Sequence, residues 1–192
     1  MKKLMSLAAV AMFAVSVFAQ RTLVSDPAHS RMQFEVTHLG INDITGNFDT
    51  VSLTLNTNDK NFVDSKFSFK ADINSIDTHV EARDNHLKSA DFFDAAQYPE
   101  LTFTTTSIAK TKTKNVYTLS GNLSFHGVTK PVTVKLIYKG SVVNPMSKAN
   151  TYSYQFVGTL KRSDFGVGPK FPEAMISDEV RIKGDFELGE QK

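Results

Sequence analysis

The amino-acid sequence predicts an all-β protein, an eight-stranded antiparallel barrel with one short helix in the connection around residues 78–93. Two observations carry this prediction. Apolar and polar residues alternate along eight segments, which is typical of strands with one buried face and one face in water. No long helical pattern exists to cover an open sheet, so closure into a barrel is the simplest way to remove exposed strand edges.

Residues 1–19 are predicted to be a secretory signal peptide. Lys2 and Lys3 precede an apolar run, and Val17 and Ala19 place small residues just before Gln20. The run is shorter than the ~20 residues of a membrane span, so we expect no stable membrane insertion. We expect cleavage after Ala19, a periplasmic or secreted protein, and one domain over residues 20–192.

Composition excludes several classes of function for residues 20–192. Removal of Lys2 and Lys3 lowers the formal net charge from +2 to 0, so nothing favours binding to nucleic acid. The chain has no cysteine, which excludes disulfides, thiolate nucleophiles and cysteine-ligated metals.

The eight predicted strands follow one another in chain order, and each places its apolar side chains on one face. These positions are Met32, Phe34 and Val36; Val51, Leu53 and Leu55; Phe67, Phe69, Ala71 and Ile73; Leu101 and Phe103; Tyr117, Leu119, Gly121, Leu123 and Phe125; Val132, Val134, Leu136 and Tyr138; Tyr152, Tyr154, Phe156, Gly158 and Leu160; and Val180, Ile182, Gly184, Phe186 and Leu188. The three glycines on these faces predict sharp bends or the close approach of another group.

The helix is predicted over residues 80–88, with a capping box between Thr78 and Glu81. Two adjacent exposed phenylalanines would be unfavourable, so Phe92 and Phe93 are expected to fill one end of the barrel. Arg83 has two interpretations, which the sequence leaves open. Its fork of donors suits a phosphate or carbonyl oxygen, or it forms an ion pair with Asp84 or Asp91 that fastens the helix, which we prefer.

The histidines do not form a predicted catalytic or metal site. His38 shares the inward parity of its strand and could bind the polar head of a ligand, although a structural role is preferred. His79 and His86 are seven residues apart, which suits no single metal ion, and neither HExxH nor GxSxG occurs. We therefore expect no metal, no cofactor and no catalytic residue.

The interior of the barrel is the best candidate site. An eight-stranded barrel is either filled by side chains or holds one small ligand. Composition alone slightly favours a solid aromatic core. The phenylalanines with inward parity are Phe34, Phe67, Phe69, Phe103, Phe125, Phe156 and Phe186.

Five motifs together resemble those of the YceI-like family of periplasmic lipid-binding proteins, in kind, order and spacing. They span from about Val24 to Leu188. They are RDNHLKSADFFD at residues 83–94, FHGVTKPV at 125–132, DPAHS at 26–30 leading to FEVTHLG at 34–40, RSDFG at 162–166, and SDEV at 177–180.

The resemblance implies a lipocalin-like barrel whose elongated apolar cavity holds an isoprenoid or fatty-acyl chain, and this shifts the balance from a solid core to a cavity. The predicted ligand contacts are Met32, Phe34, Val36, His38, Phe67, Phe69, Phe103, Leu123, Phe125, Tyr154, Phe156, Ile182, Arg83, His86, Phe92 and Phe93.

The sequence thus predicts a carrier or sequestering protein for a long-chain isoprenoid or other amphiphilic lipid, such as a quinone precursor, rather than an enzyme. One alternative is an enzyme that acts on such a lipid, with His38 or His86 as general base. Another is a solid-core interaction or stress protein that works through its rim, beside a membrane redox protein. A homodimer is left open.

Overall fold

The computed structural model describes residues 20–58 and 62–191. The predicted signal peptide lies outside these residues. Within the described part of the chain, no helix has both the length and the apolar character needed to cross a membrane.

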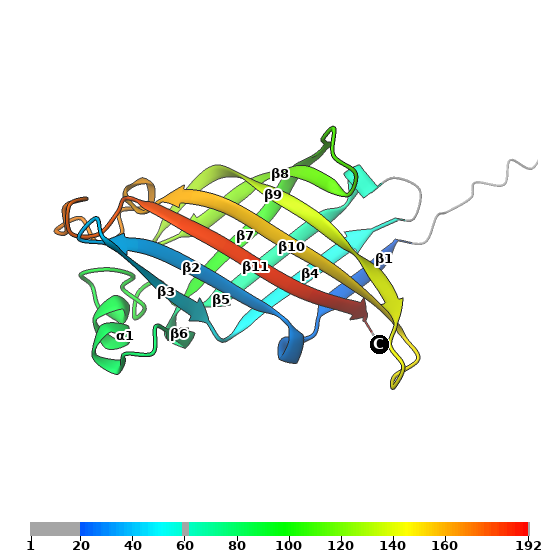
Figure 1. The fold of residues 1–192 in the computed structure, drawn as a ribbon, viewed down its shortest axis with the longest axis horizontal. Helices are drawn as coiled ribbons and strands as arrows, with labels where there is room; N and C mark the ends of the chain where they lie inside the picture. The colour runs from blue at the N-terminus through cyan, green and yellow to red at the C-terminus, as the bar shows by residue number, and fades with distance from the viewer. Residues whose placement is uncertain (1–19, 59–61, 192) are drawn as a thin grey trace, which may run out of the picture.

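The described residues form eleven strands and one α-helix, joined by short 3-10 turns (Figure 1). The strands are β1 (Arg21–Ser25), β2 (Arg31–His38), β3 (Asn42–Phe48), β4 (Val51–Thr57), β5 (Lys66–Asp72), β6 (Ile76–Asp77), β7 (Glu100–Lys110), β8 (Val116–Phe125), β9 (Val128–Val143), β10 (Asn150–Lys161) and β11 (Glu179–Glu190). The helix α1 spans Glu81–Lys88, and the 3-10 turns are η1 (Pro27–His29), η2 (Phe62–Asp64), η3 (Ile73–Ser75) and η4 (Arg162–Phe165).

These strands make a closed antiparallel barrel of eight chain paths, as predicted. The order β1-β4-β5-β7-β8-β9-β10-β11 is closed by pairing of β11 with β1. Toward its N-terminal end, β11 pairs with β2, β2 with β3, and β3 with β6. β1 and β2 are therefore one interrupted path, as are β3 with β4 and β5 with β6.

The interruptions are short and locally stabilised, and the sequence did not predict them. η1 separates β1 from β2, residues 49–50 separate β3 from β4, and η3 separates β5 from β6. At two of these breaks an aspartate accepts a backbone hydrogen bond two residues on: Asp26 Oδ1 from Ala28 N, and Asp72 Oδ1 from Asn74 N, both at 2.9 Å. Such side-chain bonds favour a turn over a continuous ladder.

One end of the barrel has a gap in its wall, because β6 has no partner on its outer side within the described sheet and β7 begins only at Glu100. The segment between them, residues 78–99, contains α1. Figure 1 shows α1, the β2–β3 turn and the loop before β11 gathered at this end, while the β9–β10 hairpin and the C-terminal end lie at the other.

The helix is confirmed, but the predicted capping box is wrong. α1 begins at Glu81, and its N-cap, Val80, makes no side-chain cap hydrogen bond. Instead Asp84 reaches back to Thr78, with Oδ1 accepting from Thr78 N at 2.8 Å and from Thr78 Oγ1 at 2.5 Å. Asp84, a buried carboxylate inside the helix, thus accepts the hydrogen bond from Thr78 N that the predicted capping box assigned to Glu81.

Candidate functional site

The barrel encloses an apolar space in two adjoining parts. The inner cavity has a volume of about 90 Å³ and lies in the middle of the barrel. The outer chamber has a volume of about 360 Å³ and lies at the α1 end. The two parts share the side chains of Phe34, Phe48, Leu101, Leu160 and Ile182, so they meet at these residues.

The inner cavity is lined by apolar side chains, apart from Gln33, whose side-chain amide donates to Asn47 Oδ1 at 3.3 Å. The predicted contacts found here are Met32, Phe34, Phe67, Phe69, Phe103, Leu123, Phe156 and Ile182. Eight of the sixteen predicted ligand contacts therefore line the inner cavity, and their contact with a ligand stays a prediction.

Most of the other predicted contacts line the outer chamber. Its lining includes the predicted contacts Phe34, Val36, His38, Arg83, His86, Phe92, Phe93, Phe125 and Ile182. His38 and Lys161 are exposed lining residues, so the chamber reaches the surface between the β2–β3 turn and β10.

Tyr154 lies elsewhere. It lines a separate hollow of about 280 Å³ at the opposite end of the barrel, together with Tyr117, Tyr138, Tyr152 and Arg21. Burial raises the pKa of its hydroxyl. Its parity was assigned correctly, but parity gives no position along the barrel axis.

Two glycines make room for the inner space by letting aromatic rings lie against the barrel wall. Phe34 faces Gly46 across β2 and β3, and a Cβ at Gly46 would overlap the Phe34 ring. A Cβ at Gly121 would likewise overlap the ring of Phe103. The close approach predicted for Gly121 is confirmed.

A loop after β10 covers one side of the outer chamber. We call residues 166–177 the lid, since Val167, Phe171, Met175 and Ile176 from this loop line the chamber. Phe165, at the end of η4, is buried below it.

Arg162 holds the lid in place, although it is not among the residues predicted for the site. Its guanidinium donates to five backbone carbonyl oxygens of the lid. The acceptors are Val167 O (3.1 Å), Gly168 O (2.8 Å), Phe171 O (2.5 Å), Ile176 O (3.1 Å) and Ser177 O (3.2 Å). Arginine has five N–H donors, so one side chain fixes the path of the whole loop. Its place in the RSDFG motif was the only signal in the sequence.

The lid also contacts the segment after α1. Phe92 stacks on Phe171 with ring centroids 4.5 Å apart and an interplanar angle of 15°. Lys170 Nζ donates to Asp91 Oδ1 at 2.7 Å, and His86 Nε2 lies 3.5 Å from Asp91 Oδ2. Two segments far apart in the chain thus close the outer chamber together, and the expectation that Phe92 fills this end of the barrel is confirmed by its burial.

The ion pair preferred for Arg83 is wrong. Its Nε donates to Thr78 Oγ1 and its terminal nitrogen to Thr78 O, each at 2.7 Å. Asp84 accepts from Thr78, and Asp91 pairs with Lys170. Arg83 still fastens the helix, but through a threonine, and it also lines the outer chamber.

The charged side chains that line the outer chamber are Arg83, Lys161 and Arg162, with no aspartate or glutamate among the lining residues of the described chain. The histidines of this lining, His38 and His86, lie at the same end. No group of three or more His, Asp or Glu side chains suited to a metal ion occurs within residues 20–58 and 62–191. The chamber is therefore apolar inside and basic around its polar edge.

The model of the YceI-like domain matches residues 23–188 of this chain. The chain belongs to the YceI-like family. UPF0312 protein VPA0850 of Vibrio parahaemolyticus, a relative, is 35% identical over 159 residues, which cover 82% of each chain.

Solved structures agree with this YceI-like fold. BcnA of Burkholderia cenocepacia superposes with a TM-score of 0.76 at 24% identity, covering 85% of this chain and 98% of that one. A polyisoprenoid binding domain from Saccharophagus degradans superposes with a TM-score of 0.67 at 16% identity, covering 90% and 100%. At these identities the likeness shows the fold, and it confirms the predicted barrel.

Proposed function

We propose that this YceI-like protein binds one long-chain isoprenoid or similar amphiphilic lipid inside the barrel and carries or sequesters it. The observation that carries the proposal is the apolar space that runs from the outer chamber to the inner cavity. Its larger part, about 360 Å³, falls within the ~300–1,000 Å³ of typical ligand pockets.

The alkyl chain would occupy the inner cavity, where each buried methylene contributes roughly 0.8 kcal/mol. The polar head would lie in the outer chamber beside Arg83, His86 and His38. A basic edge of this kind suits a phosphate or another electron-rich head group. The predicted contacts other than Tyr154 are the proposed ligand contacts.

Two further observations support this proposal. The structural neighbour from Saccharophagus degradans is described as a polyisoprenoid binding domain. Family membership and a binding-domain fold favour a binding protein over an enzyme. Export to the periplasm, proposed from residues 1–19, would place the protein where a lipid must cross water.

The test is to purify the protein without detergent and to record native mass spectra, followed by mass spectrometry of an organic extract. We expect an adduct of one lipid per chain and an isoprenoid or acyl lipid in the extract. A clean extract, together with failure to bind fluorescent prenyl and fatty-acid probes, would remove the proposal.

A matched pair of variants locates the ligand. Leu160 faces the junction of the two parts of the cavity, and Thr159 beside it on β10 is exposed. Leu160→Trp should reduce the amount or the mass of the adduct, whereas Thr159→Trp should leave both unchanged. Equal adducts in the two variants would place the lipid outside the barrel.

A further inference from the structure

The hollow that contains Tyr154, here called the tyrosine hollow, is separate from the space proposed for the lipid. It shares no lining residue with the inner cavity or with the outer chamber. Phe67 lines the inner cavity, and its ring meets the ring of Tyr154 edge to face at 5.5 Å. These two rings stand between the two spaces, so the proposed lipid accounts for none of the tyrosine hollow.

Tyrosine is concentrated in this hollow. Four of the five tyrosines of the chain line it: Tyr117, Tyr138, Tyr152 and Tyr154. Phe62 completes an aromatic wall, since its ring is stacked with that of Tyr154 at 6.0 Å and lies 4.8 Å from that of Tyr117. All of these rings except that of Tyr154 are only half-buried. The wall therefore has ring surface left for offset or edge contacts with the ring of a ligand.

The hydroxyl groups of the hollow favour a ligand that accepts a hydrogen bond. Tyr154 is 5% exposed, and its hydroxyl makes no hydrogen bond within residues 20–58 and 62–191. The same is true of the hydroxyls of Tyr117 and Tyr138. Burial raises the pKa of Tyr154, so its hydroxyl keeps its proton and can donate. Because buried polar groups in proteins are nearly always hydrogen-bonded, an oxygen acceptor beside Tyr154 is favoured.

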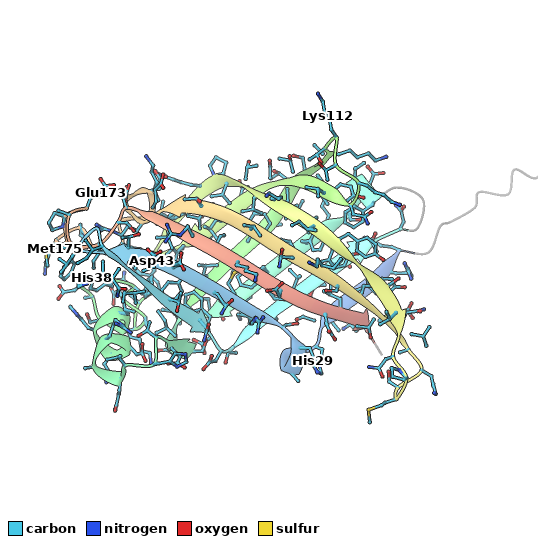
Figure 2. All side chains as sticks on the ribbon, in the orientation of Figure 1. His29, His38, Asp43, Lys112, Glu173 and Met175 are labelled. Atoms are coloured by element: carbon cyan, nitrogen blue, oxygen red, sulfur yellow. The ribbon has the colours of Figure 1, made fainter. Side chains whose placement is uncertain are left out.

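The lining favours an uncharged ligand. Among the described residues that line the hollow, Arg21 is the one charged side chain, and it already has partners in the protein. Its Nη1 donates to Tyr152 Oη at 3.0 Å and lies 3.4 Å from Glu190 Oε1. Lys112, in the turn just before the lining residue Asn115, points away from the barrel (Figure 2). A neutral carbonyl oxygen therefore suits the tyrosine hydroxyls better than a carboxylate or an ammonium group.

We propose that the tyrosine hollow is a second binding site, which takes a small uncharged aromatic molecule that carries a carbonyl group. The ring of the ligand would lie against the aromatic wall, and its carbonyl oxygen would accept from Tyr154 Oη. The hollow has a volume of about 280 Å³, just below the ~300–1,000 Å³ of pockets for drug-sized ligands, which suits a molecule of one or two rings. Asn115 is an exposed lining residue, so the ligand can enter beside it.

The experiment compares two probes that differ in the carbonyl oxygen. 2-Acetylnaphthalene carries it and 2-ethylnaphthalene does not, and isothermal titration calorimetry gives the affinity of each for the purified chain. We expect one molecule of the ketone per chain, bound more tightly than the hydrocarbon. The chain has no tryptophan, so its intrinsic fluorescence comes from tyrosine, and the ketone should quench it because four of the five tyrosines line the hollow.

Two matched variants test the role of the hydroxyl. Tyr154→Phe should lower the affinity for the ketone by about three- to tenfold and leave the affinity for 2-ethylnaphthalene unchanged. Its melting temperature should stay equal or rise, because the hydroxyl makes no hydrogen bond with the described residues. Tyr98→Phe makes the same change in the tyrosine outside the hollow, beside His126, and should leave both affinities as in the wild type.

Leu160→Trp, the variant at the junction of the lipid cavity, separates the two sites. It should leave the affinity for the ketone unchanged while it reduces the lipid adduct. Loss of ketone binding in Leu160→Trp would place the probe in the lipid cavity and overturn the proposal. Equal ketone affinity in the wild type and in Tyr154→Phe, or no measurable binding by the wild type, would also overturn it. None of these outcomes bears on lipid binding, which the native mass spectra test separately.

Discussion

The two halves of the barrel have the same alternating pattern but opposite packing. Seven inward side chains around the middle of the barrel and toward its β9–β10 end are at most 1% exposed, and we call them the girdle: Leu23, Leu55, Phe67, Leu119, Leu136, Phe186 and Leu188. Toward the α1 end, inward side chains such as Phe34, Val36, Phe125 and Ile182 remain half-buried although they point into the barrel. Their exposed surface faces the outer chamber.

The difference teaches that burial of the inward face does not follow from strand pattern alone. At the girdle the ring of strands is closed, and rings such as Phe67 and Phe156 meet edge to face at 5.4 Å. At the α1 end the wall is completed by residues 78–99 and by the lid, which cross the opening without filling it. The girdle stabilises the fold and bounds the inner cavity through Phe67, Leu119 and Phe186, whereas the α1 end encloses the larger space.

The largest expected effect is the loss of a girdle side chain. Phe67→Ala removes a ring that is 0% exposed and contacts the rings of Phe62, Tyr154 and Phe156. The free energy of unfolding, from urea denaturation, should fall by about 3–5 kcal/mol. Phe34→Ala removes a half-buried ring that lies where the inner cavity meets the outer chamber, so it should lower this free energy by less and should weaken lipid binding. Equal losses at the two positions would contradict the comparison between the halves.

Arg162 provides the next largest effect. Arg162→Met leaves five lid carbonyls without their donor, and we expect a loss of about 1–3 kcal/mol in the free energy of unfolding. Amide hydrogen exchange should increase across residues 166–177 and remain unchanged in the girdle. Arg162→Lys keeps the charge but not the fork of donors, so it should behave like the methionine variant. Full rescue by lysine would show that charge, rather than the carbonyl bonds, holds the lid.

Alternation predicted the eight chain paths because each path carries several apolar residues at successive inward positions. It missed β1, where only Leu23 and the flanking Thr22 and Val24 give a short signal, and β3, where Gly46 occupies an inward position. Glycine has no side chain to count, yet its absence of Cβ is what admits the Phe34 ring.

The site was predictable as a set of inward residues but not as a volume. Parity assigned Phe34 and Tyr154 to the same interior, although they face opposite ends of the barrel. The hydrogen-bond partners of Thr78 and Arg162 could not be predicted from the sequence, for a different reason. Several acceptors compete within a few residues of each, and only the three-dimensional path of the loop decides among them.

The smallest effect is expected at the contact between the lid and the segment after α1. The hydrogen bond from Lys170, with a further contribution from His86, holds the pKa of Asp91 below its ordinary value. A lowered pKa means that the pairing favours the closed lid at neutral pH and is lost as the pH falls through that lowered pKa. Because the groups are exposed, Asp91→Asn should leave the melting temperature unchanged.

The effect of Asp91→Asn should appear instead in the rate of lipid exchange, measured with a fluorescent prenyl probe. Exchange from the wild type should become faster in acid, and the variant should exchange at the faster rate already at neutral pH. A pH profile that is the same in both proteins would assign no gating role to this contact.

The central claim is that the ligand chain passes from the outer chamber into the inner cavity beside Phe34. Its most direct test is the affinity of the wild type and of Gly46→Ala for prenyl alcohols of increasing length. In the wild type, affinity should rise with each isoprene unit until the inner cavity is filled. In the variant, the new Cβ would displace the Phe34 ring or Cγ2 of Thr78, 2.8 Å away, so affinity should level off at a shorter chain. Affinity that is independent of chain length, or that levels off at the same length in both proteins, would contradict the account.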